Sequence, residues 1–392
     1  MSDVVITSAV RTSIGRLGGG LSSRSSWELG GTVIAEVLKR SGVHPNEVSE
    51  VILGQVLTAG AGQNPARKAA VSAGIPFEVP AFLINQLCGS GLRAVALGGQ
   101  AVKLGDSEIV VVGGQESMSQ APHCSLLRKG NKLGDISFVD TLIHDGLWDA
   151  FGNCHMGKTA ENIAQKWNID RAQQDLYALN SQNKAIAAKN SGRFIEEVVP
   201  VSIYNPKGET RVCEDEEIRI DTTLERLGNL RPVFQKEGGS VTAGNSSGIS
   251  DGAAALVLMS SKSALARGIE PLGRIVSWAS TGLSPEIMGM GPVSATRLAL
   301  NKAGWKMEDL DLIEANEAFA SQSCAIAGEL RWDLEKVNVN GGAIALGHPI
   351  GASGARILVT LLHELKRRQG RRGLATLCIG GGMGIALCVE RN

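Results

Sequence analysis

Two stretches at opposite ends of the 392-residue chain follow the same pattern. Residues 33–53 (VIAEVLKRSGVHPNEVSEVIL) and 295–315 (ATRLALNKAGWKMEDLDLIEA) each read as an amphipathic helix, a glycine, a short acidic connection and a strand. Gly42 and Gly304 are equivalent in this alignment and stand 262 residues apart. The sequence therefore predicts two copies of one α/β unit.

The repeat continues through two glycine-rich turns. At the same offset, residues 89–91 (GSG) fall on residues 351–353 (GAS), and each begins a helical stretch. Each helical stretch leads to an apolar strand that ends in glycines, at 111–114 (VVGG) and 378–381 (CIGG). Short Val/Ile runs that alternate with helical periods are typical of an α/β protein with buried strands.

Residues 118–248 have no counterpart in the second copy and are richer in charge and in irregular segments. We interpret them as an inserted loop domain, a kind of segment that often covers substrates or joins subunits. The expected division is residues 1–117 with 249–270 for the N-terminal half, 118–248 for the insertion and 271–392 for the C-terminal half.

Charge and cysteine usage exclude several classes of function. Lys and Arg number 39 and Asp and Glu number 39, so no overall field attracts nucleic acid or an anionic membrane surface. No window approaches the ~18 consecutive apolar residues of a membrane span, and we expect no secretion signal. Seven cysteines without CxxC spacing fit neither a disulfide framework nor a zinc site, so we expect a cytoplasmic protein that binds no metal.

Cys88 lies in the segment INQLCGSGL (84–92), at a predicted strand-to-helix turn. Free backbone N–H groups and the positive end of the helix dipole stabilise a thiolate there, so we expect the Cys88 pKa to lie below the usual value of about 8.5. The adjacent glycines allow a sharp turn and a close approach of a substrate carbonyl to the main chain. Cys88 is thus a candidate nucleophile, with an inert buried cysteine as the alternative.

His348 lies in the segment NGGAIALGHPIGASG (340–354), which is too rich in glycine to be optimised for stability. A histidine in such a segment before a helix indicates a group presented into a cleft, so His348 is the candidate base. A phosphate-binding loop is disfavoured because neither GxxxxGK[ST] nor a strand-associated GxGxxG is present. A hydrogen-bonded core histidine remains the alternative.

Two further segments carry candidate groups. Cys378 ends a buried strand in LATLCIGGGMG (374–384), where glycine N–H groups suit a developing oxyanion and a thiol beside them suits proton exchange. Asn316 lies in IEANEAFA (313–320), as either a helix N-cap or a group that orients a water in a site. A structural role is the alternative for Cys378 as well.

These blocks, in this order and at these separations, strongly resemble the thiolase family. The resemblance also includes GQNPAR at residues 62–67 and extends from end to end of the chain. It implies an α/β fold with a five-layered αβαβα core of two duplicated halves and a loop domain inserted in the first half. This agrees with the repeat and the insertion found above.

The resemblance also implies a reaction and a set of roles. Cys88 would accept an acetyl group from acetyl-CoA, with His348 as the base that activates it, and Cys378 would act as acid and base at the substrate α-carbon. One oxyanion hole would use His348 with a water held by Asn316, and the other the backbone N–H groups of Cys88 and Gly380. The net reaction is a reversible, ping-pong condensation of two acetyl-CoA to acetoacetyl-CoA and CoA. These thioesters are substrates, so no separate cofactor is expected.

The same resemblance suggests residues that contact the coenzyme A moiety and a preference for short acyl chains. His155 and Met156 match a loop near the acyl pocket, where a methionine fills the space of a longer acyl tail, although ordinary helix-start packing is the alternative for Met156. Arg219 would meet the nucleotide end or pair only with its acidic neighbours. The suggested contacts are Leu147, His155, Met156, Arg219, Phe234, Ala243, Ser247, Met288, Ala318 and Phe319.

Alternatives to the short-chain enzyme stay open. A 3-ketoacyl-CoA thiolase of broader chain length has the same chemistry with a longer pocket, and a ketoacyl synthase would have His in place of Cys378. A non-catalytic thiolase-like binding protein is a further alternative, although Cys88 and His348 are both present. The family is typically homotetrameric, as a dimer of dimers. Departures from its pattern are Gln115, Ser117 and Arg226.

Overall fold

A computed structural model describes residues 3–206 and 208–391. The strands are β1 (Val4–Thr12), β2 (Gly15–Arg16), β3 (Glu50–Gly54), β4 (Ala81–Ile84), β5 (Ile109–Ser117), β6 (His123–Cys124), β7 (Val139–Asp140), β8 (Trp148–Asp149), β9 (Cys154–His155), β10 (Val198–Val199), β11 (Val201–Asn205), β12 (Gly208–Val212), β13 (Ser250–Ser260), β14 (Gly273–Gly282), β15 (Leu312–Ala315), β16 (Arg372–Ile379) and β17 (Met383–Glu390). The α-helices are α1 (Ser26–Ser41), α2 (Pro65–Ser72), α3 (Ser90–Leu104), α4 (Met156–Lys166), α5 (Arg171–Asn190), α6 (Leu224–Gly228), α7 (Ser261–Ala266), α8 (Gly291–Ala303), α9 (Ala320–Leu330), α10 (Ala343–Leu346) and α11 (Ser353–Arg368).

The predicted duplication is visible in the strand ladders. In the first half β3 is parallel to β5, β5 is antiparallel to β13, and β13 is antiparallel to β1. The second half repeats this order, with β15 parallel to β16, β16 antiparallel to β17 and β17 antiparallel to β14. Among residues 3–206 and 208–391, strand pairing joins the two half-sheets where Val5 pairs with Arg274 and Ile6 with Gly273.

Local sequence explains the equivalent helices. A capping box between Ser25 and Glu28 starts α1, and Gly42 ends the helix in the left-handed conformation at φ 66°. The equivalent helix α8 ends in the same way, at Gly304 with φ 69°. A short 3-10 turn and a buried strand follow in both copies, β3 and β15. The helix, glycine, connection and strand predicted from the sequence are therefore confirmed in both copies.

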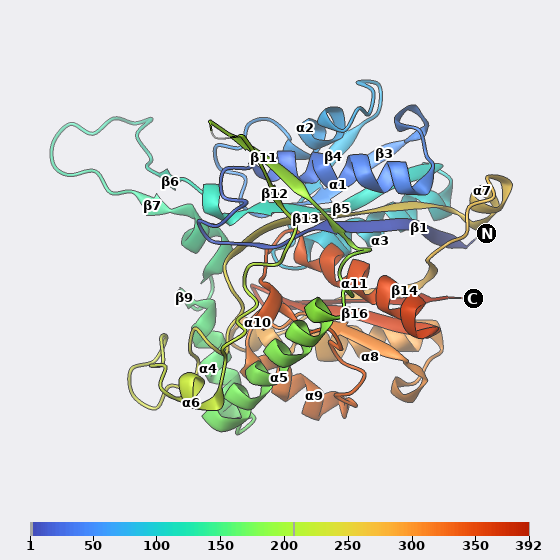
Figure 1. The fold of residues 1–392 in the computed structure, drawn as a ribbon. Helices are drawn as coiled ribbons and strands as arrows, with labels where there is room; N and C mark the ends of the chain where they lie inside the picture. Colours follow the sequence, from blue (N-terminus) through green and yellow to red (C-terminus); the bar gives the residue numbers. More distant parts are fainter. Residues whose placement is uncertain (1–2, 207, 392) are drawn as a thin grey trace.

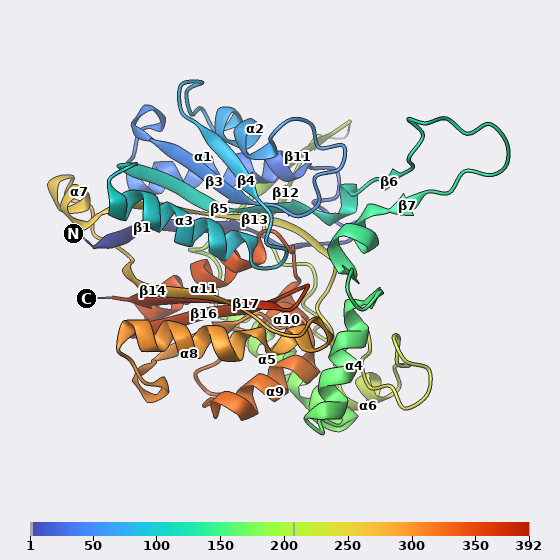
Figure 2. The same cartoon turned by 180° about the vertical axis from the view of Figure 1, so that it is seen from behind.

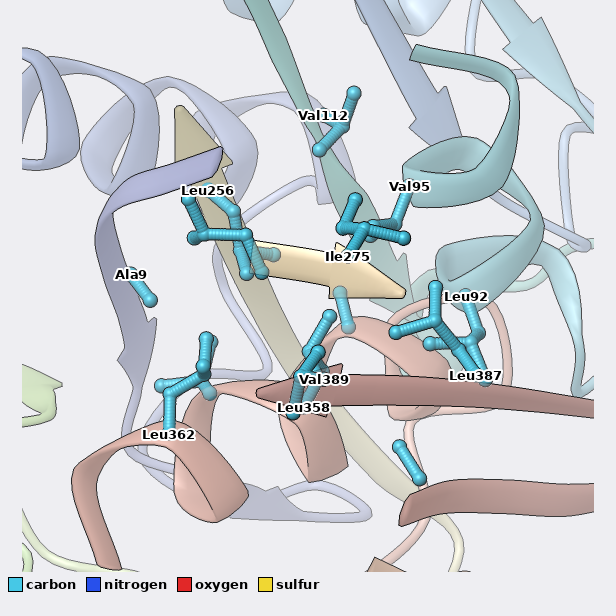
Figure 3. Packing of buried hydrophobic residues seen from close by; sticks show 14 of the residues in the cluster. Ala9, Leu92, Val95, Val112, Leu256, Ile275, Leu358, Leu362, Leu387 and Val389 are labelled. Carbon is cyan, nitrogen blue, oxygen red and sulfur yellow. The ribbon is translucent and has the colours of Figure 1, made fainter. Parts of the chain in front are cut away.

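The elements form five layers (Figures 1 and 2). Helices α1 and α2 cover the outer face of the first sheet, α3 and α11 lie between the two sheets, and α8 covers the outer face of the second sheet with α9 beside it. Figure 3 shows the apolar core around the middle layer. Its side chains come from both sheets and both central helices, and include Ala9, Leu92, Val95, Leu256, Leu358, Leu362, Leu387 and Val389.

Between β5 and β13 the chain leaves the first sheet. The β6–β7 hairpin extends away from the body of the molecule, whereas α4 and α5 pack on α9 of the second half (Figure 1). Buried Arg11 of β1 holds this part of the chain through ion pairs of 2.7 Å to both Glu197 and Asp215. The exact domain boundaries remain a prediction. In the described ranges, no helix is long and apolar enough to cross a membrane.

The middle layer depends on backbone contact between α3 and α11. A Cβ added at Gly91 would lie 2.7 Å from the backbone nitrogen of Ala355, and one at Gly354 would lie 2.3 Å from that of Leu92. Real Cβ atoms do not approach other backbones so closely, so both positions require glycine. This contact sets how close the first turns of the two helices lie.

Gly91 and Gly99, both in α3, form a matched pair for testing this contact. We expect Gly91→Ala to lower the free energy of unfolding by about 1–3 kcal/mol, because the added methyl group overpacks a backbone contact. At Gly99 the nearest atom would be the Cδ1 of Ile275 at 3.5 Å, so Gly99→Ala should gain up to about 1 kcal/mol from helix propensity. Urea unfolding midpoints measure both. Equal stability of the two variants would contradict the close contact.

Candidate active site

A cavity of about 550 Å³ collects most of the predicted site residues. Its wall is made by the turns before α3 and α11, the end of β16 and segments of the insertion. The predicted residues in the wall are Cys88, Leu147, His155, Met156, Arg219, Phe234, Ala243, Ser247, Met288, Ala318, Phe319, His348, Cys378 and Gly380. Asn316 does not line the cavity, but its Nδ2 lies 3.4 Å from the His348 Nε2.

Cys88 lies in a strained turn between β4 and α3. Leu87, directly before it, has a φ of 47°, a conformation that a leucine rarely adopts. Two side chains hold the turn: Asn85 Oδ1 accepts a hydrogen bond from Leu87 N at 2.9 Å, and Ser90 Oγ accepts one from Gln86 N at 2.8 Å. Ser90 Oγ also donates to the Leu87 carbonyl at 2.6 Å. The turn therefore presents the Cys88 side chain to the cavity at the start of α3.

The expected low pKa of Cys88 is wrong. Burial raises the pKa of this thiol to about 11, and the charge of Glu116 adds to the increase. Hydrogen bonds from the backbone N–H groups of Gly380 and of Cys88 itself act in the opposite direction and are outweighed. The helix terminus is present, but loss of solvent has the larger effect. Cys88 is therefore a thiol at neutral pH and needs a base to become a nucleophile.

The hydrogen bonds of His348 assign the role of each ring nitrogen. Ser353 Oγ lies 2.6 Å from His348 Nδ1 and donates its single hydrogen to the Pro349 carbonyl at 2.9 Å. With the Ser353 hydrogen on the Pro349 carbonyl, we assign the ring proton to Nδ1, which then donates to Ser353. Nε2 is left with its lone pair, and the Asn316 amide lies on that side.

His348 is poised to accept a proton. Burial lowers the pKa of the imidazole to about 3, and the charge of Arg356 contributes in the same direction. The ring is therefore neutral at physiological pH, as a base must be before it acts. A neutral imidazole and the Cys88 thiol face the same cavity.

Cys378 ends β16 on the same side of the cavity and is 1% exposed. Burial and the nearby Cys88 raise the pKa of its thiol, so it too is neutral at rest. The apolar side chains around Cys378 belong to Met156, Ala160, Val241, Met288, Ala318 and Phe319. A thiol in such surroundings holds its proton until a charged group forms beside it.

Asn316 follows β15 and is fixed through its backbone, whose N–H donates to the Thr376 carbonyl at 3.0 Å. Its Oδ1 is buried and has no hydrogen-bond partner within the described ranges. The next residue, Glu317, is held by Asn338 Nδ2 and Ser181 Oγ, each at 2.7 Å. Asn316 thus lies on rigid backbone, with its amide directed at His348.

Comparison with known proteins identifies the family. The thiolase N-terminal domain matches residues 4–262, and the thiolase C-terminal domain matches residues 269–391. The chain belongs to the thiolase family. It is 60% identical over 387 residues to the acetyl-CoA acetyltransferase of Shinella zoogloeoides, which covers 99% of this chain and 98% of that protein. It is 58% identical over 391 residues to the acetyl-CoA acetyltransferase of Paracoccus denitrificans, covering 100% of both.

Solved thiolase structures have the same fold. The crystal structure of the Bacillus anthracis acetyl-CoA acetyltransferase superposes with a TM-score of 0.97 at 46% identity, over 100% of this chain and 99% of that chain. Human mitochondrial 3-ketoacyl-CoA thiolase gives the same TM-score and coverage at 44% identity. The thiolase fold expected from the sequence is therefore confirmed.

In this thiolase the outer part of the cavity has an aromatic wall. The rings of His155 and Phe234 stack with centroids 4.6 Å apart, and the Phe319 ring meets Phe234 edge-on at 6.4 Å. Ser247 Oγ donates to the Ala318 carbonyl at 3.1 Å. Arg219 forms an ion pair of 3.5 Å with Glu217, so it has a local acidic partner although it also lines the cavity.

Several cavity residues were not predicted from the sequence. Eight of them lie within two positions of a predicted residue and could have been found by extending each motif: Gly146, Glu217, Val233, Thr242, Ser246, Gly248, Ile249 and Ile350. Arg16, Leu17 and Met118 are distant in the sequence from every predicted site residue and gave no signal.

The three departures from the family pattern lie outside the cavity wall. Gln115 is buried and donates to Gln55 Oε1 at 2.9 Å, and Ser117 donates to the Arg24 carbonyl at 3.0 Å. Arg226 forms an exposed ion pair with Asp221. Each departure therefore has a local hydrogen-bond or charge partner.

The neutral state of Cys88 predicts how it reacts with iodoacetamide. Because only the thiolate reacts, the alkylation rate should rise about tenfold per pH unit between about pH 7 and pH 10. Peptide mass spectrometry measures the rate at Cys88, and exposed Cys124 in the same digest reports the pH dependence of the reagent itself. A plateau in the Cys88 rate below about pH 8 would show a stable thiolate and contradict this assignment.

Proposed function

We propose that this chain is an acetyl-CoA acetyltransferase that condenses two acetyl-CoA to acetoacetyl-CoA and CoA, and also catalyses the reverse thiolysis. The proposal rests chiefly on the convergence of two neutral thiols, Cys88 and Cys378, with the neutral imidazole of His348 around one cavity. Full-length relatives named acetyl-CoA acetyltransferase, 56–60% identical to this chain, support it.

In the first half-reaction the Cys88 sulfur attacks the thioester carbonyl while His348 Nε2 takes the thiol proton. The oxygen of the tetrahedral adduct becomes negative and is stabilised by backbone N–H groups, for which we propose Cys88 and Gly380. As the adduct collapses, the CoA thiolate leaves and takes the proton of Cys378. The enzyme then carries acetyl-Cys88, imidazolium at His348 and thiolate at Cys378.

The second half-reaction restores the starting protonation states. The Cys378 thiolate removes an α-proton from a second acetyl-CoA, and the resulting enolate oxygen is stabilised by protonated His348 and a water held by Asn316. The α-carbon attacks the acetyl group, and the leaving Cys88 thiolate recovers its proton from His348. CoA thioesters are the substrates, and we propose no separate cofactor.

The side chains near Cys378 favour substrates with short acyl chains. Met156 and Met288 are 8% and 4% exposed and belong, with Ala318 and Phe319, to the same buried apolar cluster as Cys378. These side chains occupy the space that a longer acyl tail would need. We therefore favour acetoacetyl-CoA over the longer substrates of a broad-chain 3-ketoacyl-CoA thiolase.

We also propose a homotetramer in the cytoplasm. The β6–β7 hairpin extends away from the body of the molecule (Figure 2) and carries apolar side chains that are strongly exposed, including Leu126 at 99% and Leu133 at 94%. Several exposed apolar side chains on one extended segment, Leu126, Leu127, Leu133, Ile136, Phe138 and Val139, mark a surface that another subunit would cover. All seven cysteines are free, which suits a reducing compartment.

Mass spectrometry after incubation with acetyl-CoA tests the covalent step. We expect one added acetyl group on the Cys88 peptide and none in Cys88→Ala. Cys378→Ala should still acetylate Cys88 slowly but form no acetoacetyl-CoA, because the α-proton has no acceptor. An intact rate of acetyl transfer in Cys88→Ala would refute the assignment of the nucleophile.

Thiolysis rates test the chain-length preference. We expect kcat/KM for acetoacetyl-CoA to exceed that for 3-ketohexadecanoyl-CoA by at least about tenfold. Met156→Ala should reduce this ratio by opening the acyl end of the cavity. Met290→Ala is the control, since Met290 is equally buried but packs in the core beneath the second sheet and does not line the cavity. A preference for the long substrate would overturn the short-chain proposal.

A further inference from the structure

Glu116, near the end of β5, is a fully buried carboxylate that the mechanism above does not use. It accepts three backbone hydrogen bonds: from Val56 N at 2.9 Å, Leu57 N at 3.1 Å and Gly351 N at 2.9 Å. The first two donors follow β3 in the N-terminal copy. The third follows His348 by three residues in the C-terminal copy. One side chain thus joins both copies of the repeat.

The contact with Gly351 leaves no room for a side chain. A Cβ at this position would lie 2.6 Å from Glu116 Oε2 and 2.7 Å from Gln55 Cα. The loop that carries His348 is therefore pressed directly against the segment after β3. This contact fixes the loop from one side, while Ser353 fixes the imidazole ring within it.

The same segment supports the nucleophile. Val56, Leu57 and Ile350 form one buried apolar cluster, against which Leu87 and Cys88 pack. Glu116 is close enough for its charge to raise the pKa of the Cys88 thiol. Glu116 therefore binds Val56 and Leu57, which pack against Cys88, and Gly351, which belongs to the His348 loop.

A purely structural carboxylate would be an unfavourable choice here. Burial raises the pKa of Glu116 to about 8, the three N–H groups lower it in part, and the nearby charge of Asp251 raises it further. No cation is among these influences in the described part of the chain. A buried carboxyl group without a cation beside it, whether it is ionised or protonated, costs stability relative to an apolar residue. Its hydrogen bonds instead determine where two catalytic loops lie.

We propose that Glu116 is a positioning residue for acyl transfer, which sets the distance between the Cys88 sulfur and His348 Nε2 by holding the His348 loop on the segment beneath Cys88. This rests on the proposed function, in which His348 takes the Cys88 proton. Proton transfer needs a heavy-atom separation near 3 Å, and a displacement of about 1 Å can reduce the rate about 100-fold.

Glu116→Gln tests the proposal because the amide has a single acceptor oxygen and turns an NH₂ group toward backbone donors. We expect the rate of Cys88 acetylation in a single turnover, and kcat, to fall roughly 10- to 100-fold. KM for acetyl-CoA should change less than about threefold, since the coenzyme A wall is untouched. Single-turnover mass spectrometry and steady-state kinetics measure the two effects.

Glu161→Gln is the matched control. Glu161 is also a buried carboxylate that accepts backbone N–H groups, from Ser240 and Val241 at 2.9 Å each, but it holds the segment leading to Thr242 and Ala243 in the coenzyme A wall. We expect this variant to raise KM more than it lowers the acetylation rate. Thermal unfolding of both variants separates loss of stability from loss of rate.

Each result decides the question. If the wild-type enzyme forms acetyl-Cys88 and Glu116→Gln forms it at the same rate, the positioning role alone is overturned. If the wild-type enzyme forms no acetyl-Cys88, the proposed function is overturned. If Glu116→Gln does not fold, Glu116→Asp keeps the carboxyl group and shortens the side chain, and Gly351→Ala displaces the other partner of the contact. A folded form of either with wild-type kcat would equally overturn the proposal.

Discussion

The site depends on a backbone contact that only glycine allows. Gly91 in α3 and Gly354 in α11 each bring one helix against the backbone of the other, so the first turns of the two helices lie closer than side chains would permit. The segment before each helix carries one reacting group, Cys88 or His348. The fold therefore determines the spacing of nucleophile and base through its core, and the high glycine content reflects this packing as well as the site.

Burial at this contact explains why the site is uncharged at rest. The pKa of Cys88 is raised and that of His348 is lowered, mainly by desolvation in the cavity wall, where His348 is buried and Cys88 is partly buried. In the proposed mechanism, charge appears only during the reaction, when a substrate carbonyl becomes an oxyanion close to Gly380 and Asn316. Dipoles fixed in advance stabilise charge more effectively in such a site than in water. If Cys88 were a thiolate before substrate binds, the same dipoles would already stabilise its charge, and they would lower the energy of the oxyanion less.

The sequence predicts the fold correctly but does not predict the pKa values of the site residues. The repeat around Gly42 and Gly304 is a local pattern of helix, turn and strand, so the sequence alone is enough to predict it. The wrong expectation for the Cys88 pKa used only the local helix terminus. The decisive burial comes from segments far away in the chain, which no local pattern reveals. Arg16 in the cavity wall and the three donors of Glu116 were missed for the same reason, since both depend on tertiary contacts.

The duplication also explains how the two copies divide the work. Equivalent segments precede α3 and α11, yet one presents a cysteine and the other a histidine, so a symmetric scaffold supplies an asymmetric pair. Cys378 lies near the end of β16, where the repeat places Val111 in the equivalent strand β5, and Glu116 follows five residues after Val111. The C-terminal copy thus provides most of the chemistry, and the N-terminal copy provides the nucleophile and the contact that holds the base loop. In the further proposal above, a side chain of one copy therefore fixes the loop that carries the base in the other copy, through the hydrogen bond from Gly351 N to Glu116.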